Sequence, residues 1–321
     1  MIQAKEILAL ATETLKTESD SILGLINKLG EGFVNSVQLI HASKGRIVIT
    51  GIGKSANIAN KIVATLNSTG SPAIFMHAAD AIHGDLGNIQ KNDVVICISN
   101  SGNTPEIKVL IPYIKKLGNK IIAFAGNENS FLAEHADLFV YTGVAKEACP
   151  NNLAPTSSTT AQLAMGDALA VCLLKLNGFG ETDFAKYHPG GALGKKLYLK
   201  VKDIYPLNEK PEISPQANLK ELIVEISSKR LGVAAVIENG NLKGIVTDGD
   251  LRRMMMKTDD FSNFTAKDIM SVAPKTIDEN ELAVAALELM EQNKITQLIV
   301  MKDQQYAGII HLHDLLREGI L

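Results

Sequence analysis

Residues 93–115 constrain the fold of this 321-residue chain more than any other stretch. A short apolar run over 94–98 predicts a buried strand, which stops in the polar loop Ser99-Asn100-Ser101-Gly102-Asn103-Thr104 before a helix with Pro105 at its first position. The free amides and the dipole of a helix N-terminus favour an anion, and the loop hydroxyls add neutral donors. The loop therefore predicts a phosphate site, although Thr104 as an ordinary N-cap is the simpler interpretation. No lysine follows the glycine, which excludes a nucleotide P-loop.

Further short apolar runs cover residues 46–50, 73–76, 120–125 and 138–141, and they alternate with helical or turn-rich stretches. This alternation predicts an α/β fold with a doubly wound parallel sheet, whose ligands bind beyond the carboxyl ends of the strands. Loops 51–55 and 142–160 follow two of these runs, and the helix after the second loop begins with the hydroxyls of Thr156, Ser157 and Ser158. The predicted site therefore lies at one edge of the sheet.

The N-terminal residues 4–15 and 22–40 have apolar side chains at helical spacing and predict two helices for packing or for subunit contacts. The inward candidates are Leu8, Leu15, Ile22, Leu25, Ile26, Leu29, Val37 and Ile40.

The composition of the chain indicates which kind of ligand it binds and in which cellular compartment it works. A formal charge of -3 and a pI near 6.2 give no electrostatic footprint for nucleic acid, so a small polar metabolite is expected. Charges are mixed into the N-terminus and no stretch predicts a membrane span, which favours a soluble, cytoplasmic protein. Three cysteines without a CxxC pair fit a reducing compartment, and we expect Cys97 and Cys172 to be buried.

The loops GIGKS, SNSGNTPE and APTSSTTAQLA resemble the sugar isomerase domain, a five-stranded α/β module that binds phosphorylated sugars. With HAADAIHGDLG, AKEACPNNLAPTSST, YHPGGALGKKL and a C-terminal repeat, the whole chain resembles the bacterial arabinose-5-phosphate isomerases. The resemblance implies that D-ribulose 5-phosphate and D-arabinose 5-phosphate are interconverted to supply the lipopolysaccharide sugar Kdo. It also implies a homotetramer in which neighbouring subunits contribute site loops. A non-catalytic phosphosugar sensor and an isomerase for another sugar phosphate remain alternatives.

Moving a carbonyl between two carbons requires a base and a group that stabilises the enediolate oxygen. Lys54, Glu106, Glu147 and His188 form such a set, and these positions match the family's catalytic residues. We expect Glu147 to shuttle the proton, His188 to open the sugar or move protons between its oxygens, and Lys54 to hold the oxyanion. Glu106 would orient a sugar hydroxyl or Lys54. The simpler interpretations are a dipole-complementing Glu106, a solvated Lys54, a surface Glu147 and a structural His188. Expected substrate-binding residues are Gly53, Ser55, His83, Ser99, Asn100, Ser101, Gly102, Asn103, Thr104, Thr156, Ser157 and Ser158.

His77 and His83, with Asp80 and Asp85 nearby, suggest a metal site, but their spacing fits no standard zinc signature. Enediol chemistry of this type runs without metal when a lysine or a backbone donor stabilises the oxyanion. We therefore expect no required cofactor. Inhibitory zinc bound through His83 and His188 is a separate prediction.

After residue 199 a repeat of roughly 64 residues occurs twice and resembles the tandem cystathionine-β-synthase module, an α+β domain pair. The expected domains are a sugar isomerase domain at 1–199 and repeats at 200–262 and 263–321. Asp250 and Asp314 match the family's ribose-contacting aspartate, but His311 replaces Thr247 in the second copy. The pair is therefore either a dimerisation or packing module or a sensor, for which the family resemblance implies an adenine nucleotide. CMP-Kdo, the nucleotide sugar at the end of the pathway, is a second expected regulator, which would bind either the repeats or the isomerase cleft.

Overall fold

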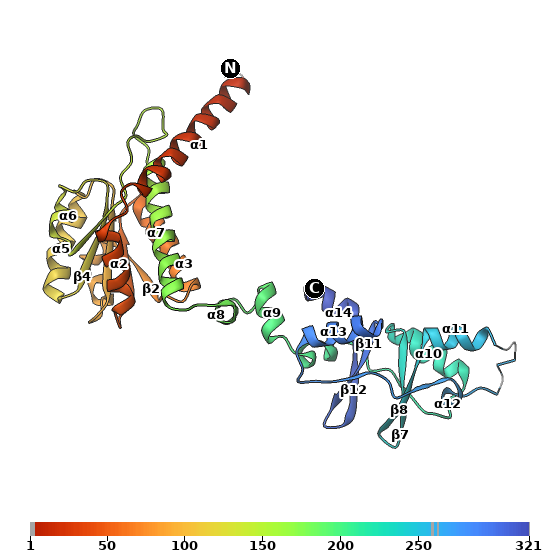
Figure 1. Cartoon of the computed structure of the whole chain (residues 1–321). Helices are drawn as coiled ribbons and strands as arrows, with labels where there is room; N and C mark the ends of the chain where they lie inside the picture. The colour runs from red at the N-terminus through yellow and green to blue at the C-terminus, as the bar shows by residue number, and fades with distance from the viewer. Residues whose placement is uncertain (1–3, 258–259, 262, 321) are drawn as a thin grey trace. The chain divides into compact units, whose positions relative to one another are not determined.

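The computed structural model describes residues 4–257, 260–261 and 263–320. The chain forms two compact units, Met1–Phe184 and Ala185–Leu321 (Figure 1). The first unit contains the predicted sheet, and the second contains both repeats.

A five-stranded parallel sheet in the order β2-β1-β3-β4-β5 forms the centre of the first unit. Its strands are β1 (Ile47–Gly51), β2 (Ala73–His77), β3 (Val94–Ser99), β4 (Lys120–Ala125) and β5 (Leu138–Tyr141). Every residue of β1 and β3 is buried, as expected for central strands of a sheet that helices cover on both faces. The predicted α/β class and the doubly wound sheet are confirmed.

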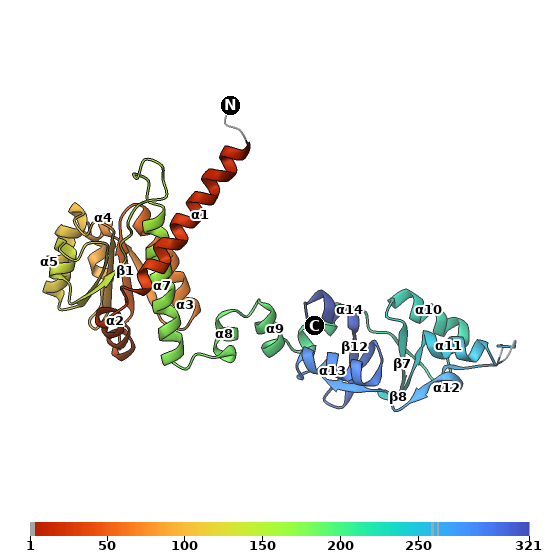
Figure 2. The ribbon, with the colours of Figure 1, turned by 45° about the horizontal axis from the view of Figure 1, so that its top comes forward.

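Two layers of helices cover this sheet (Figure 2). The helical elements are α1 (Ala4–Ile26), α2 (Glu31–Ala42), α3 (Lys54–Ser68), α4 (Ala78–Ala81), η1 (Asp85–Asn88), α5 (Pro105–Leu117), α6 (Phe131–His135), α7 (Ser157–Leu176) and α8 (Glu181–Tyr187). One apolar cluster joins the sheet to α2, α3 and α7, and a second joins its other face to α4, α5 and α6. Helices α3 and α7 approach closely because Gly166 has no Cβ, which would collide with Ile62.

The N-terminal prediction is partly wrong. A single helix, α1, covers the predicted break, and the chain turns only at residues 27–30 before α2. Leu25, Val37 and Ile40 are buried as predicted. The other candidates are exposed in this chain, namely Leu8, Leu15, Ile22, Ile26 and Leu29. Leu8 and Leu15 lie in the first half of α1, which extends beyond the sheet (Figure 1). Ile22, Ile26 and Leu29 lie nearer the sheet, but they are not part of the apolar cluster that contains Leu25.

Helix α7 is, among the described residues, the one helix long and apolar enough to cross a membrane by length and composition. This differs from the sequence expectation. In the first unit it packs on α3, and Met165, Leu169 and Leu173 lie in the core, so it serves here as a core helix. Cys97 is fully buried as expected, whereas Cys172 on α7 is only half-buried.

The second unit contains two sheets, ordered β6-β7-β8-β9 and β10-β11-β12. Its elements are α9 (Ala192–Tyr198), η2 (Val201–Asp203), η3 (Tyr205–Leu207), β6 (Glu212–Ile213), α10 (Leu219–Lys229), β7 (Val233–Glu238), β8 (Asn241–Thr247), α11 (Asp248–Met255), α12 (Ala266–Ile269), β9 (Ser271–Val272), β10 (Thr276–Asp278), α13 (Ala283–Asn293), β11 (Gln297–Lys302), β12 (Gln305–His311) and α14 (Leu312–Arg317). The α+β tandem repeat is confirmed. Each copy completes the other, since Val201 and Ile204 lie in the core of the second repeat and Ala266 lies in that of the first.

Candidate active site

Three helices begin at the carboxyl edge of the sheet, where β1, β3 and β5 end. Their N-caps are Gly53 for α3, Thr104 for α5 and Thr156 for α7, and none of the three caps its helix through a side-chain hydrogen bond. The first amides of a helix have no partner within the helix. The starts of α3 and α5 therefore offer backbone donors and positive dipole ends to a ligand. At the start of α7, the amides of Thr156 and Ser158 already donate to the carboxylate of Glu147.

A cavity of about 260 Å³ lies at this edge. It is lined by Ile52, Lys54, Ser55, Ile98, Ser99, Asn100, Ser101, Thr104, Pro155, Ser158 and Thr159. Seven of the predicted site residues are among them: Lys54, Ser55, Ser99, Asn100, Ser101, Thr104 and Ser158. The structure thus brings the predicted phosphate loop together with the starts of α3 and α7.

The phosphate loop is held by its own hydroxyls. The Oγ atoms of Ser99 and Thr104 lie 2.8 Å apart, and the amide of Gly102 donates to Ser99 Oγ at 3.1 Å. Gly102 has a φ of +64°, and a Cβ there would collide with Ser130. Within the described residues, the amides of Ser101 and Thr104 make no hydrogen bond. Thr104 is therefore not an ordinary capping residue, and the loop keeps donors available for an anion.

Glu147 is tied to the start of α7. Its Oε2 accepts hydrogen bonds from the amide of Thr156 at 2.8 Å, from the Thr156 hydroxyl at 3.1 Å and from the amide of Ser158 at 3.1 Å. Burial alone would raise the pKa of Glu147, but the hydrogen bonds from Ser158 and Thr156 outweigh it and hold the pKa below its ordinary value. An ionised carboxylate therefore lies beside Ser158, which lines the cavity.

Lys54 is the first residue of α3, and its side chain is exposed at the cavity. The preceding Gly53 has a φ of +57°, a conformation that favours glycine. The next residue, Ser55, donates from its hydroxyl to Gln162 Oε1 at 3.2 Å. The buried Gln162 joins the starts of α3 and α7. Sequence reasoning missed Gln162, although it follows Ser158 by four residues and therefore lies on the same face of α7.

Several predicted residues do not line this cavity. Glu106 is half-buried in the first turn of α5, as predicted, and Asn103 accepts a hydrogen bond from the amide of Phe131. Ser157 is fully buried, and its hydroxyl has no partner among the described residues. His83 is exposed after α4, and His188 belongs to the second unit. Ile52, Ile98, Pro155 and Thr159 line the cavity but were not predicted; Thr159 alone had a signal, in the hydroxyl run at the start of α7.

Among the described residues, the two histidines near the end of β2 do not form a metal site with their neighbours. His77 Nδ1 lies 3.5 Å from Asp80 Oδ2, and His83 is exposed. In the part of the chain that the structure describes, no three His, Cys, Asp or Glu side chains are placed to hold an ion together.

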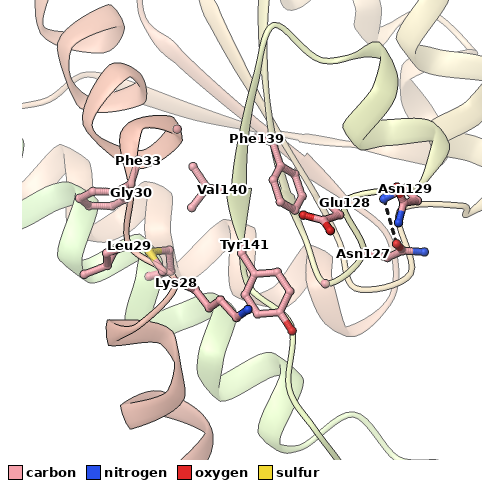
Figure 3. Close-up of a pocket in the computed structure, with 13 residues that line it drawn as sticks. Lys28, Leu29, Gly30, Phe33, Asn127, Glu128, Asn129, Phe139, Val140 and Tyr141 are labelled. Carbon is pink, nitrogen blue, oxygen red and sulfur yellow. Dashed lines mark hydrogen bonds between the residues drawn. The ribbon is translucent and has the colours of Figure 1, made fainter.

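A second cavity, of about 420 Å³, lies beside β5 (Figure 3). The turn between α1 and α2 and the loop 126–129 after β4 form its walls, and Lys28 Nζ lies 5.5 Å from the centre of the Tyr141 ring. No predicted site residue lines it. Its loop nevertheless supports the phosphate loop, because the amide of Gly126 donates to the Asn100 carbonyl at 2.9 Å.

The two aspartates of the repeats are occupied by neighbouring protein groups. Asp250 accepts from the amide and the hydroxyl of Thr247 and from Arg253, at 2.9, 2.6 and 2.6 Å. Burial alone would raise the pKa of Asp250, but these hydrogen bonds outweigh it and lower the pKa. Asp314 accepts from the amide of His311 at 2.9 Å and from Asn208 Nδ2 at 2.6 Å. Asp250 is thus part of the N-terminal capping box of α11, and Asp314 is part of that of α14.

Comparison with known proteins accounts for both units. Residues 39–172 match the model of the SIS domain, and residues 201–257 and 266–320 match that of the CBS domain. The arabinose 5-phosphate isomerase KdsD of Pseudomonas aeruginosa is 45% identical over 324 residues, which cover 100% of this chain and 99% of that protein. The chain belongs to the arabinose 5-phosphate isomerase family. The KdsD proteins of Francisella tularensis and Escherichia coli K12 are 47% and 43% identical, with 96% of this chain and 95% of each relative covered.

Solved structures resembling this member of the arabinose 5-phosphate isomerase family cover its first unit. A protein of Escherichia coli CFT073, solved in complex with arabinose 5-phosphate, is 40% identical with a TM-score of 0.57, over 59% of this chain and 100% of that one. A putative sugar-phosphate isomerase of Listeria monocytogenes is 36% identical with a TM-score of 0.57, over the same shares. The family resemblance seen in the sequence motifs is therefore confirmed.

Proposed function

We propose that this chain interconverts D-ribulose 5-phosphate and D-arabinose 5-phosphate through an enediolate. The observation that carries the proposal is the cavity at the carboxyl edge of the sheet, where a lysine, a hydroxyl-rich loop and the starts of α3, α5 and α7 meet. The membership of the chain in the arabinose 5-phosphate isomerase family supports this substrate pair. The substrate phosphate would bind to the loop Ser99–Thr104 through backbone amides and hydroxyls.

In the proposed reaction, Glu147 removes a proton from C1 of the ketose, and the electron pair of the C–H bond forms the C1–C2 double bond. The carbonyl oxygen on C2 takes up the negative charge, which the ammonium of Lys54 stabilises. A proton moves from O1 to O2 with His188 as carrier, and Glu147 returns a proton to C2. The result is the aldose, and no oxidant or reductant is required.

The position of Glu147 supports its role as the base. The hydrogen bonds from Thr156 and Ser158 orient its carboxylate and hold its pKa below the ordinary value, so Glu147 is ionised at neutral pH. Glu106, in the first turn of α5, would orient Lys54 or a sugar hydroxyl. The proposed substrate-binding set is completed by Gly53, Ser55, His83, Thr156, Ser157 and Ser158.

The experiment that tests this proposal is incubation of the full-length protein with a panel of aldose and ketose phosphates in deuterated water. We expect D-arabinose 5-phosphate to form from D-ribulose 5-phosphate with deuterium bound to carbon at C2, because an enediolate exchanges its proton with solvent. Turnover of another pentose or hexose phosphate in preference would redefine the substrate. Binding of sugar phosphates without any turnover would indicate a sensor instead.

The assembly and pathway are part of the same proposal. We expect a cytoplasmic homotetramer that supplies Kdo for lipopolysaccharide synthesis. The exposed apolar residues of α1, such as Leu8 at 69% and Leu15 at 69% exposure, suit a contact between subunits. Light scattering after size exclusion should give four times the chain mass, and a monomer would contradict this assembly.

Two ligands are proposed as regulators. An adenine nucleotide or CMP-Kdo would bind the repeat pair only by displacing the partners of Asp250 or Asp314, so calorimetric titration of the full chain should reveal weak binding that is lost in Asp250→Ala. Zinc would bind His83 and His188 and block turnover. Treatment with a chelator should then raise activity, and a loss of activity that added metal restores would contradict the absence of a required cofactor.

A further inference from the structure

The turn that contains His188 belongs to the second unit, together with the repeats. Residues 188–191 read His-Pro-Gly-Gly and lead directly into α9. The carbonyl of His188 accepts a hydrogen bond from the amide of Gly191 at 3.1 Å, which closes the turn. The position of His188 is therefore set within the unit that contains the repeats.

Helix α9 packs directly on this turn. Gly194, in its first turn, is buried, and a Cβ at this position would collide with the carbonyl of His188 and lie 2.7 Å from Pro189 Cα. No residue larger than glycine fits without displacing the turn. A movement of α9 is consequently transmitted to His188.

Helix α9 has seven residues, too few to be stable alone, so its orientation depends on its anchors. One anchor is Lys195, whose Nζ donates to the carbonyl of Glu318 at 3.0 Å and to Glu318 Oε2 at 2.8 Å. Glu318 is the C-cap of α14, where the helix dipole favours a cation. A second anchor follows α9, where the amide of Ala283 donates to the Leu199 carbonyl at 2.8 Å. Figure 1 and Figure 2 both show α9 beside α14.

The ion pair between Lys195 and Glu318 contributes little to stability, because the two side chains are 31% and 33% exposed and solvent screens them. Its double contact with the end of α14 instead fixes the direction of α9. Neither residue is among those that line the cavity of the first unit.

We propose that Lys195 and Glu318 are positioning residues, which hold the His188 turn on the second repeat in the orientation that catalysis requires. The inference rests on the proposed role of His188. It gives the repeat pair a function in catalysis that requires no ligand, since the last helix of the second repeat holds the segment that bears His188.

The test is a comparison of full-length variants. We expect Lys195→Ala to lower kcat about tenfold with KM changed less than twofold, because a misplaced proton carrier slows the chemistry without weakening phosphate binding. Lys195→Arg should restore most of kcat, since a guanidinium can contact the same carbonyl and carboxylate. Glu318→Gln should have a smaller effect than Lys195→Ala, because the backbone carbonyl of Glu318 remains.

Two matched controls come from the same unit. Lys196→Ala removes the neighbouring lysine, which has no ion-pair partner among the described residues, and Lys229→Ala removes a 2.8 Å pair with Glu209 near the first repeat. Both should keep the kcat of the wild type. Equal losses in Lys195→Ala and the controls would contradict positioning.

A double variant separates this inference from the proposed function. If Lys195 acts through His188, then His188→Ala/Lys195→Ala should be no slower than His188→Ala alone. A large loss in His188→Ala with wild-type kcat in Lys195→Ala and Glu318→Gln would overturn the positioning role and leave the proposed function intact. Full activity of His188→Ala would remove His188 from the mechanism and overturn both.

Discussion

Three helices around the cavity begin differently from three helices of the repeats. At the carboxyl edge of the sheet, the N-cap residues of α3, α5 and α7 make no capping hydrogen bond through their own side chains. The first amides of α7 donate to Glu147 instead. In the repeats, α10, α11 and α14 start with capping boxes. In a capping box the N-cap side chain accepts a hydrogen bond from a backbone amide of the first turn, and the carboxylate three residues later accepts one from the N-cap amide.

Thr104 and Thr247 show the difference most clearly. Both are N-cap residues, but the Thr247 hydroxyl donates to Asp250 at 2.6 Å, whereas the Thr104 hydroxyl lies 2.8 Å from that of Ser99. A capping box satisfies the first amides of a helix and stabilises it. An uncapped start leaves these amides for a ligand, and the fold gives up some stability there.

The largest expected effect concerns Glu147, the proposed base at the carboxyl edge of the sheet. Glu147→Gln should lower kcat about 1,000-fold, or roughly 4 kcal/mol in activation free energy, because an amide cannot accept the proton from carbon. Steady-state kinetics with circular dichroism as a folding check would measure it. The exposed Glu128 on the neighbouring loop provides a control, since Glu128→Gln should behave as the wild type. Near-normal turnover by folded Glu147→Gln would exclude this residue as the base.

The next effect concerns the open start of α5. Thr104→Ala should raise KM about tenfold, equivalent to roughly 1.4 kcal/mol, because it removes a donor expected to bind the phosphate. The thermal midpoint should change little, since this hydroxyl does not cap the helix. Thr104→Ser keeps the hydroxyl and should retain the KM of the wild type. A large fall in the midpoint without a change in KM would mean that Thr104 is structural.

At the start of α11, where a capping box is present, the same type of substitution should lower stability and leave KM unchanged. Thr247→Ala removes the cap and one donor to Asp250, and should cost about 1 kcal/mol of unfolding free energy. Denaturant titration would measure the cost, and kcat and KM should remain within twofold of the wild type. Thr247→Ser is the matched control, because serine caps a helix as well as threonine does. A rise in KM in Thr247→Ala would contradict the view that helix starts with a capping box serve stability and not substrate binding.

The sequence allowed the sheet, the phosphate loop and the tandem repeats to be predicted, because each has a local signal. Periodicity marked the strands, and Pro105 marked the first residue of α5. The exposure of Leu8 and Leu15 could not be predicted, since helical spacing shows which residues share a face but not whether another element covers it. Likewise, no local pattern shows that Glu147 bonds to Thr156, or that Lys195 reaches Glu318 across more than 100 positions.

The smallest effect concerns the hydrogen bonds between Glu147 and the start of α7. Thr156→Val removes a hydroxyl donor to the ionised carboxylate, so the pKa of Glu147 should rise toward its ordinary value. Because Glu147 is active as a base only when deprotonated, the acid limb of kcat/KM should then move to higher pH, with little change at neutral pH. The stability from these hydrogen bonds is present above the unfolded-state pKa of Glu147 and is lost as the pH falls through its lower folded-state value. A pH profile of Thr156→Val beside Thr156→Ser would measure the shift, and an acid limb unmoved in both variants would mean that another group limits the reaction.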